Sequence, residues 1–467
     1  MSMEKMSNIT IAYIGGGSRG WALGLMSDLA AEEALCGTVK LYDIDKDAAI
    51  CNEIIGNKLY DRIDTKGKWR YKAVDSLKES LTGADFVIIS ILPGTFNEMK
   101  SDVHAPEKYG IYQSVGDTVG PGGFMRAIRT IPMYVEIATA IKNFAPEAWV
   151  INYTNPMSLC VKTLYEVFPE IKAFGCCHEV FGTQKVLACA LKDIRGIENI
   201  KREDIKINVL GINHFTWIDR ASYKNIDLIP VYEEFVQKYY EVGFDGVDDG
   251  HWMNDTFACA NRVKFDLYKK FGLIAAAGDR HLAEFMPGNW YLKDKKTVKR
   301  WMFGLTTVDS RIEDLKKRLE KSRRLVSGQD EFIINQTGEE GVRQIKALLG
   351  LEDLVTNVNL PNKGQVKNIK DGAIVETNAL FRKDSIAPIM AGELPDHILS
   401  IVNRHISNQE TVLKSTLSEN VKMAYTAFIN DPLANLERKA SLELFKKMIE
   451  NTKEYLPEFW LSDLCVK

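Results

Sequence analysis

A glycine-rich turn near the N-terminus carries the first residues with recognisable chemistry. Gly15, Gly17 and Gly20 fit the spacing G-x-G-x-x-G, in which glycines let the backbone approach a pyrophosphate at a helix N-terminus. Asp43 ends the next apolar run, where a carboxylate binds ribose hydroxyls and repels a 2′-phosphate. These residues predict a dinucleotide site that prefers NAD to NADP, with Asp45 as the weaker choice for the ribose. A glycine-rich turn without a ligand is the alternative.

Two residue types that bind metals end two later apolar runs. Cys177 lies in the sequence Gly-Cys-Cys-His-Glu, and His214 ends the sequence Gly-Ile-Asn-His. Because successive side chains on a strand point to opposite faces, Cys177 and His178 are not expected to share an ion. One thiolate and one imidazole leave positions open for water or substrate, which favours a catalytic metal. The alternative is that Cys177 is a small buried apolar residue and His214 a core histidine.

Alternating strand-like and helix-like segments would position these residues. This pattern predicts a parallel sheet with helices on both faces, and therefore a Rossmann-like domain at residues 1–196. After Gly196 the rhythm changes, and we expect a second domain at residues 197–467 with the site between the two. The strand-like runs are 9–14, 39–42, 86–92, 149–153, 173–177 and 205–212; the helical ones are 21–35, 131–144 and the charge-rich 313–324, read as a solvated helix face.

Composition excludes several classes of function. The chain has 467 residues and 60 Lys plus Arg against 63 Asp plus Glu, so it lacks the positive charge of a nucleic-acid binder. It contains neither an apolar run of about 20 residues nor a signal-peptide pattern, so we expect no membrane contact. Eight cysteines are too few for a disulfide scaffold. These observations predict a reduced, cytoplasmic, soluble enzyme.

Several motifs together resemble glycoside hydrolase family 4 over nearly the whole chain. Within that family, the Cys-His-Glu-Val sequence at 177–180 is similar to the α-galacturonidase branch. The 6-phosphosugar branch has Cys-Asp-Met-Pro or Cys-Asn-x-Pro there, so a phosphorylated sugar is not expected. The other motifs are Gly-Pro-Gly-Gly at 120–123, Asn-Tyr-Thr-Asn-Pro at 152–156, Gly-Ile-Asn-His at 211–214, Asn-Leu-Pro-Asn-Lys-Gly at 359–364 and Val-Glu-Thr-Asn at 375–378.

The resemblance implies cleavage of α-galacturonides, here small pectin-derived oligosaccharides, by a redox-neutral elimination. NAD⁺ takes a hydride from C3, a divalent metal polarises the ketone, and a base removes the C2 proton. The glycosidic oxygen then leaves C1, water adds, and NADH returns the hydride. The family also implies a mixed α/β (α+β) second domain similar to the C-terminal domains of lactate and malate dehydrogenases, and a homodimer or homotetramer.

Four residues take binding or acid roles from the resemblance. Cys177 and His214 match the metal ligands of the family, whose usual ion is Mn²⁺, although manganese prefers harder donors than a thiolate and the metal stays open. Asn155 matches a residue that holds sugar hydroxyls, and an Asn-Pro turn is its alternative reading. His178 follows the metal cysteine, where the phosphoglycosidase branch has a proton donor, and an imidazole can donate near neutral pH.

The base is assigned to a segment of the second domain. Asp279 is our choice for the base and His281 the reserve, while other members use a Tyr. Arg280 is a candidate clamp for a substrate carboxylate. Asp117 matches an acidic residue near the metal and would tune the base. A structural salt bridge between Asp279 and Arg280 is the alternative.

Other functions remain open from the sequence. An α-glucuronidase or a neutral α-glycosidase of the same family is the first alternative. An NAD-dependent 2-hydroxy-acid dehydrogenase is the second; Cys177 with His214 argues against it, because such enzymes use no metal. A catalytically inactive NAD-binding regulator is the third. Cys176 is outside the motif and is either a thiol beside the metal site or a liability for oxidation.

Overall fold

The computed structural model of the chain describes residues 7–247 and 258–462. Within these residues, one sheet has nine strands in the order β13-β12-β11-β6-β5-β4-β1-β2-β3. The six strands from β3 to β6 are parallel and follow the order 3-2-1-4-5-6 of a dinucleotide-binding fold. They are β1 (Ser7–Ile14), β2 (Leu35–Tyr42), β3 (Trp69–Ala73), β4 (Phe86–Ile89), β5 (Trp149–Asn152) and β6 (Lys172–Gly175).

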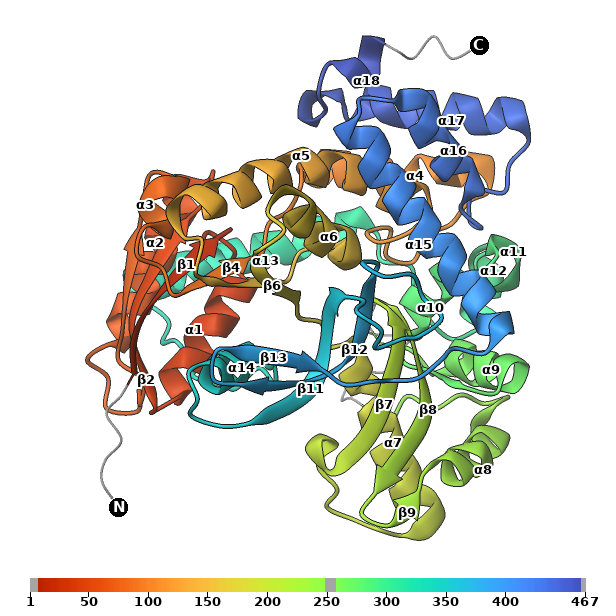
Figure 1. The fold of residues 1–467 in the computed structure, drawn as a ribbon, viewed down its shortest axis with the longest axis horizontal. Helices are drawn as coiled ribbons and strands as arrows, with labels where there is room; N and C mark the ends of the chain where they lie inside the picture. The colour runs from red at the N-terminus through yellow and green to blue at the C-terminus, as the bar shows by residue number, and fades with distance from the viewer. Residues whose placement is uncertain (1–6, 248–257, 463–467) are drawn as a thin grey trace.

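The parallel strands form because helices cover both faces of the sheet. All four residues of β4 are buried, as expected of a strand in the middle of such a sheet. The predicted parallel sheet is therefore confirmed (Figure 1). The covering helices include α1 (Trp21–Ala31), α2 (Lys46–Leu59), α3 (Leu77–Leu81), α5 (Gly120–Phe144) and α6 (Met157–Val167). Helix α4 (Phe96–His104) packs against α5, and α7 (Glu179–Arg195) packs against the second, smaller sheet.

Helix α5 differs most from the sequence prediction. We expected it to begin at Ile131, but it begins at Gly120 and includes Pro121 in its first turn and Pro132 in its interior. A proline fits the first helical turn, where its missing N–H has no helical partner. The Gly-Pro-Gly-Gly segment therefore starts the helix and places the residues before it at the helix N-terminus.

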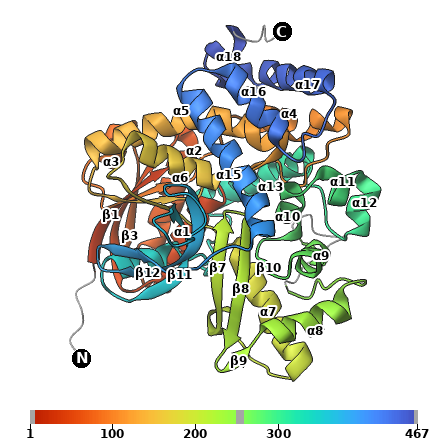
Figure 2. The same cartoon turned by 45° about the vertical axis from the view of Figure 1, so that its right-hand side comes forward.

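A second, smaller sheet lies beside the first (Figure 2). Its strands β7 (Ile205–Ile212) and β8 (Phe215–Tyr223) form an antiparallel hairpin, which β10 (Ile274–Ala275) and the short β9 (Ile226–Asp227) extend. The prediction of a strand at 205–212 is confirmed. The helices packed around this sheet include α8 (Ile229–Tyr239), α9 (Arg262–Phe271) and α10 (Asp279–Phe285).

The second half of the chain also completes the first sheet. Strand β11 (Leu354–Pro361) pairs with β6 through Asn359 and Gly175, and β12 (Ile374–Arg382) and β13 (Ser385–Pro388) follow, all antiparallel. The predicted division at residue 196 stays a prediction, but this sheet contains strands from both sides of it. The fold class, a Rossmann-like sheet joined to a mixed α/β second part, is as expected.

Most of the remaining helices lie at the top and right of the molecule in Figure 1, whereas residues 341–348 form a helix beside β11 and β12. Phe124 of α5, Trp217 of β8 and Trp460 lie in the largest apolar core, which joins the two sheets. Among the described residues, no helix is both long and apolar enough to cross a membrane. These helices are α11 (Gly288–Tyr291), α12 (Lys295–Arg300), α13 (Val308–Ser327), α14 (Gly341–Leu348), α15 (Asp396–Leu417), α16 (Val421–Asn430), α17 (Arg438–Asn451) and α18 (Phe459–Ser462).

Candidate active site

The tip of the β7–β8 hairpin carries His214. Ile212 pairs with Phe215, so Asn213 and His214 alone form the turn. His214 has φ of +63°, in the left-handed region that few residues other than glycine adopt. Its buried ring lies with Nδ1 3.1 Å from the Thr118 hydroxyl. The hairpin therefore holds this predicted metal ligand against the segment that precedes α5.

Asp117 and His281 join His214 in one group of possible metal ligands. One carboxylate oxygen of Asp117 and one ring nitrogen of each histidine lie within 4.8 Å of one another. The two imidazole rings are 3.8 Å apart between centroids. A carboxylate with two imidazoles suits a first-row divalent metal with open coordination positions. The donor set therefore fits the predicted ion.

The charge states in this group also suit a metal. Burial, with a contribution from His281, lowers the pKa of His214 to about 3, so its imidazole is neutral and able to bind a cation. Burial alone would raise the pKa of Asp117. His281, Arg126 and His214 outweigh that effect and hold it well below its usual range. The carboxylate is therefore ionised at neutral pH.

Glu179 supports His281 and was not predicted from the sequence as a functional residue. Its Oε1 lies 3.7 Å from His281 Nε2, and its Oε2 accepts the Gly278 backbone N–H at 2.8 Å. Burial raises the pKa of Glu179, but His281, His214 and His178 together lower it to about 2. At 3.7 Å the two groups are within ion-pair distance, so the charge of the carboxylate acts on the imidazole. The only sequence signal was its place in the Cys-His-Glu-Val motif.

Cys177 and His178 lie beyond the end of β6, which stops at Gly175. The alternation of side chains along a strand, used above to separate the two, therefore does not apply to them. Cys177 is buried next to the Asn213 amide, and burial raises the pKa of its thiol well above the ordinary value. Among the described residues, it is not in the close group formed by Asp117, His214 and His281.

His178, the predicted proton donor, contacts Glu339, which is outside the Asp117–His214–His281 group. Its half-exposed ring places Nδ1 2.8 Å from Glu339 Oε1, and the ring centroid is 6.2 Å from that of Trp21. The hydrogen bond to Glu339 raises the pKa of His178 to about 9. The imidazole is therefore protonated at neutral pH.

The carboxylate of Asp279, the predicted base, is bonded to backbone groups of the protein. Its carboxylate accepts the backbone N–H groups of Val263 at 3.1 Å and Lys264 at 3.0 Å, at the start of α9. The residue is completely buried, and burial raises its pKa to about 6. Two carboxylate oxygens bonded to a helix N-terminus are typical of a cap. The structure therefore does not bring Asp279 into the Asp117–His214–His281 group.

Arg280, the predicted carboxylate clamp, is also engaged by protein groups. Its Nη2 donates to the Ser114 carbonyl at 3.1 Å and contacts the Thr306 hydroxyl. The Asp279 carboxylate, its partner in the alternative reading, is bonded to the backbone at the start of α9. Burial lowers the pKa of Arg280, and the nearby carboxylates of Glu179 and Asp117 partly offset this effect.

Two further arginines surround Asp117 and were missed. Arg126 donates from Nε to the Asn155 carbonyl at 2.9 Å. Arg311, in the first turn of α13, has a buried Nε with no hydrogen-bond partner in the part of the chain that the structure describes. Burial lowers the pKa of both guanidinium groups, and the Asp117 charge opposes this. No local sequence pattern indicates a function for either residue, and Arg311 lies on α13, whose sequence is typical of a charged surface helix.

Asn155, for which the family resemblance predicted a contact with sugar hydroxyls, lies beside Asp117. Its Nδ2 donates to Asp117 at 3.3 Å. Its Oδ1 is buried and accepts no hydrogen bond from the described residues. A buried amide oxygen without a donor is costly, so it favours a ligand hydroxyl at this position.

The glycine-rich turn has the shape of a dinucleotide cradle. Gly15 has φ of +93°, and a Cβ there would overlap the Ser90 carbonyl. The Gly17 N–H donates to Asp43 Oδ2 at 2.8 Å, which brings the predicted ribose ligand to the turn. Asp45 instead caps α2 through the Ala48 N–H at 3.1 Å. The geometry fits the predicted cofactor and favours Asp43 over Asp45.

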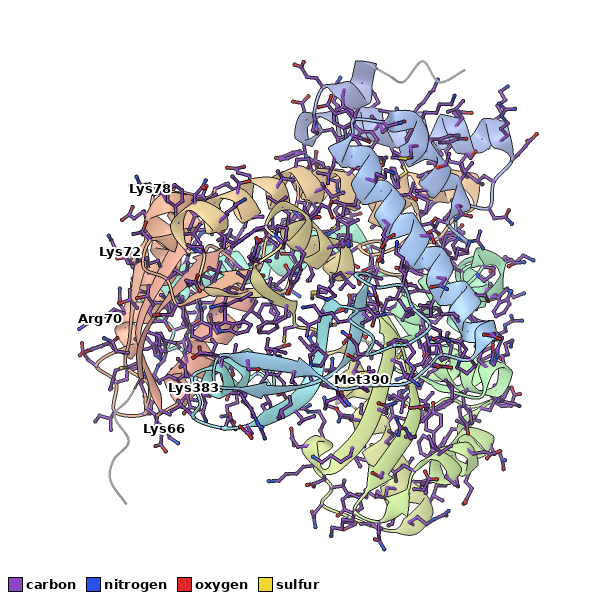
Figure 3. The ribbon with its side chains drawn as sticks, viewed as in Figure 1. Lys66, Arg70, Lys72, Lys78, Lys383 and Met390 are labelled. Atoms are coloured by element: carbon purple, nitrogen blue, oxygen red, sulfur yellow. The ribbon has the colours of Figure 1, made fainter. Side chains whose placement is uncertain are left out.

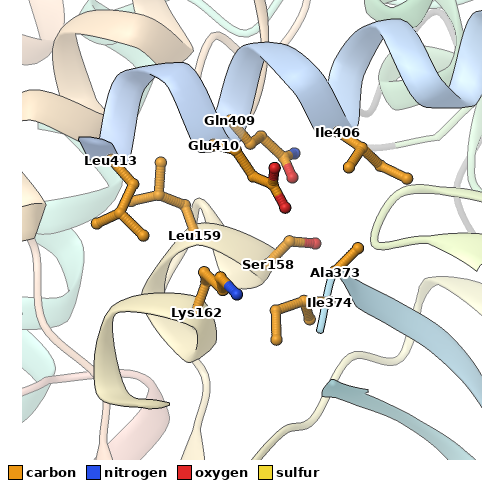
Figure 4. A pocket seen from close by; sticks show the side chains of 9 residues that line it. All are labelled: Ser158, Leu159, Lys162, Ala373, Ile374, Ile406, Gln409, Glu410 and Leu413. Atoms are coloured by element: carbon orange, nitrogen blue, oxygen red, sulfur yellow. The ribbon is translucent and has the colours of Figure 1, made fainter. Parts of the chain in front are cut away.

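A cavity and a group of basic side chains lie away from the predicted site residues. A small cavity between α6 and α15 is lined by Ser158, Lys162, Gln409 and their neighbours, and contains none of the predicted site residues (Figure 4). The labelled basic side chains near β3 in Figure 3 have local partners: Arg70 stacks on Tyr60, and Lys72 pairs with Glu79 at 2.9 Å.

Comparison with known proteins decides the family. Residues 10–193 match the description "family 4 glycosyl hydrolase", and residues 209–434 match the C-terminal domain of the same family. The chain belongs to glycosyl hydrolase family 4. A family 4 relative, the alpha-galacturonidase of Thermoanaerobacterium saccharolyticum, is 68% identical over 97% of each chain. The alpha-galacturonidase of Bacillus subtilis (strain 168) is 52% identical over 96% of this chain and 98% of its own.

Solved family 4 structures confirm the fold. A putative glucosidase from Bacillus subtilis has a TM-score of 0.90 at 52% identity, covering 94% of this chain and 99% of its own. A 6-phospho-alpha-glucosidase from gut microorganisms, solved with NAD and Mn²⁺, has a TM-score of 0.81 at 20% identity, covering 97% and 99%. NAD and Mn²⁺ are the two groups predicted from the sequence.

Proposed function

We propose that this family 4 enzyme is an α-galacturonidase that cleaves small pectin-derived galacturonides. The 68% identity to the Thermoanaerobacterium saccharolyticum alpha-galacturonidase, over 97% of both chains, carries this proposal. Three further relatives of that name are 59%, 58% and 52% identical. The predicted homo-oligomer and the predicted cytoplasmic location stay predictions.

The charges around Asp117 support an acidic sugar. Arg126, Arg280 and Arg311 are the cations on which its charge acts. A uronate adds a carboxylate to this region, and guanidinium groups bind carboxylates with two parallel hydrogen bonds. Arg280 is already bonded to Ser114 and Thr306, whereas the Arg311 Nε lacks a partner among the described residues. We assign binding of the substrate carboxylate to Arg311. Arg280 instead holds the segments of Ser114 and Thr306 in place.

His214 is the metal ligand that both the sequence and the geometry support. Asp117 supplies the oxygen donor that Mn²⁺ prefers, and Cys177 stays a predicted ligand. Gly15, Gly17, Gly20 and Asp43 hold the dinucleotide. When bound, NAD⁺ exchanges a hydride with C3 of the sugar, and the divalent ion makes the C2 proton acidic by polarising the adjacent carbonyl.

The protein groups then move protons. We assign removal of the C2 proton to His281, the reserve choice, because the Glu179 carboxylate lies beside its ring and its Nδ1 has no protein partner in the described ranges. Asp279 supports the start of α9 instead. His178, kept protonated by Glu339, donates to the departing glycosidic oxygen. Asn155 orients the sugar hydroxyls through its unpartnered Oδ1.

Substrate preference tests this function. Three p-nitrophenyl substrates, the α-galacturonide, the α-glucuronide and the α-galactoside, are each offered with NAD⁺, Mn²⁺ and a thiol reductant. We expect the galacturonide to have the highest kcat/KM. Arg311→Ala should lower that value by about 100-fold, as expected for loss of a charged hydrogen bond of 1.5–3 kcal/mol, and leave any slow turnover of the neutral galactoside unchanged.

The matched control is Arg323→Ala, because Arg323 lies on the same helix with its side chain 75% exposed. It should retain the wild-type kcat/KM for all three substrates. Preference for the glucuronide or the galactoside would contradict the proposed substrate. Equal losses on acidic and neutral sugars in Arg311→Ala would contradict the assignment of Arg311.

A further inference from the structure

Helix α13 connects the second half of the chain to the dinucleotide-binding half. Near its start, Asp309 pairs with Lys100 of α4 at 3.2 Å. At its end, Lys58 of α2 donates to the carbonyls of Leu325 at 2.8 Å and Val326 at 2.7 Å. A helix of 20 residues is about 30 Å long. Both ends are therefore fixed to the first domain, and the middle lies between α4 and α2.

The middle of α13 meets the glycine-rich turn through Arg318. A Cβ built on Gly20 would overlap the Nη1 atom of Arg318. Glycine at position 20 therefore leaves the space that the guanidinium occupies. The Arg318 Nε is bonded to Asp314 one turn earlier at 2.6 Å, which fixes the direction of the side chain. This helix face is thus more than the solvated surface predicted from its composition.

Two positive groups face each other at this contact. Helix α1 begins just after Gly20. The Trp21 N–H at its start donates to the Ser18 hydroxyl at 3.1 Å, and its first turn contains no acidic residue. The N-terminus of a helix carries about half a positive charge. Asp314 is bonded to the Nε of Arg318, and the positive charges of the helix end and of the guanidinium together favour an anion that contacts both.

We propose that Arg318 binds the diphosphate of the dinucleotide, so that the second half of the chain contributes directly to the cofactor site. The proposal rests on NAD being the cofactor, as proposed above. A diphosphate at the glycine-rich turn satisfies both the α1 N-terminus and the guanidinium with charge-assisted hydrogen bonds. Arg311 lies seven residues earlier and hence on the same face of α13. One helix face then holds both the substrate carboxylate and the cofactor phosphates.

Binding measured by calorimetry, without substrate, tests this inference. NAD⁺, ADP-ribose and adenosine are titrated into the full-length wild type, Arg318→Ala, Arg318→Lys and the exposed control Arg323→Ala. Arg318→Ala should raise the Kd of NAD⁺ and of ADP-ribose about tenfold, with Arg318→Lys between it and the wild type. The Kd of adenosine, which has no phosphate, should not change. The control should match the wild type.

Three results would overturn parts of this proposal separately. If Arg318→Ala binds NAD⁺ as the wild type does, Arg318 does not contact the diphosphate. If both Arg318 variants weaken adenosine as much as NAD⁺, the residue supports the fold and not the phosphates. If the wild type itself does not bind NAD⁺, the proposed cofactor is wrong, whatever Arg318 does.

Discussion

His281 lies between an imidazole and a carboxylate, and these neighbours give it two possible uses. The His214 ring is 3.8 Å away, and Glu179 is within 3.7 Å of Nε2. A metal between the histidines would use a nitrogen of His281 as a ligand, whereas a carboxylate–imidazole pair works as a general base. The proposed base assignment therefore has a consequence that metal binding can test.

Mn²⁺ affinity separates the two uses. In His281→Gln we expect the Kd for Mn²⁺ to stay within about threefold of the wild type, while exchange of the C2 proton falls by at least 100-fold. In Cys177→Ser and His214→Ala we expect weaker Mn²⁺ binding, by about tenfold or more, because both are predicted ligands. Electron paramagnetic resonance of free Mn²⁺ gives the Kd values. Loss of Mn²⁺ binding in His281→Gln would make His281 a ligand.

Residue types and local spacing found the groups at strand ends and turns. His214 was proposed as a ligand because a metal-binding residue type ends a strand, and Asn155 was proposed as a sugar contact from the family resemblance; both stay predictions. Arg311 and the pairing of Glu179 with His281 could not be predicted, because each depends on contacts between segments far apart in the chain. Asp279 was misleading: a carboxylate at a helix start reads equally well as a base or as a cap.

Helix α10 connects to the segment that carries Asp117 through one buried carboxyl group. Glu284 Oε1 accepts the backbone N–H groups of Val115 at 2.7 Å and Gly116 at 2.9 Å, while its Oε2 has no partner among residues 7–247 and 258–462. Burial raises the pKa of Glu284 to about 8. The carboxyl group therefore keeps its proton in the folded protein at neutral pH.

This raised pKa gives stability a definite pH dependence. Between about pH 4.5 and pH 8 the unfolded chain has released the Glu284 proton and the folded protein retains it, so the free energy of unfolding falls as pH rises. The slope from this group approaches 1.4 kcal/mol per pH unit inside that window. Glu284→Gln should remove it. Urea unfolding at pH 5, 6.5 and 8 measures the slopes.

The control for this experiment is Glu198→Gln, since the Glu198 side chain is 66% exposed. Its free energy of unfolding should follow that of the wild type at all three pH values. Parallel pH curves for the wild type and Glu284→Gln would show that Glu284 does not retain its proton in the folded protein.

Periodicity predicted the elements that are regular over their whole length. Strand β7 has the predicted bounds, and β1 and β5 differ by one or two residues. The predicted second strand, 39–42, is shorter than β2. Strand β2 begins at Leu35, a residue that the prediction assigned to the preceding helix. Helix α2 and strand β3 were not predicted at all. Helix α2 contains many polar residues, since much of its surface is exposed.

At the scale of the whole molecule, the two halves interlock. Strands β11, β12 and β13 extend the first sheet from its β6 edge, and α13 is fixed to α2 and α4. Such contacts could not be predicted from periodicity, because they join residues more than a hundred positions apart. They place Arg318 of α13 against Gly20 of the glycine-rich turn and Arg311 of the same helix near Asp117, which lies beside His214 of the hairpin tip.

Isotope incorporation tests the proposed reaction most directly. The wild-type enzyme is supplied with p-nitrophenyl α-galacturonide, NAD⁺ and Mn²⁺ in D₂O, with a thiol reductant to keep Cys177 reduced. We expect p-nitrophenol release, one deuterium at C2 of the galacturonate product, and no net accumulation of NADH. Release that persists without NAD⁺ and metal, or a product with hydrogen retained at C2, would contradict the elimination reaction.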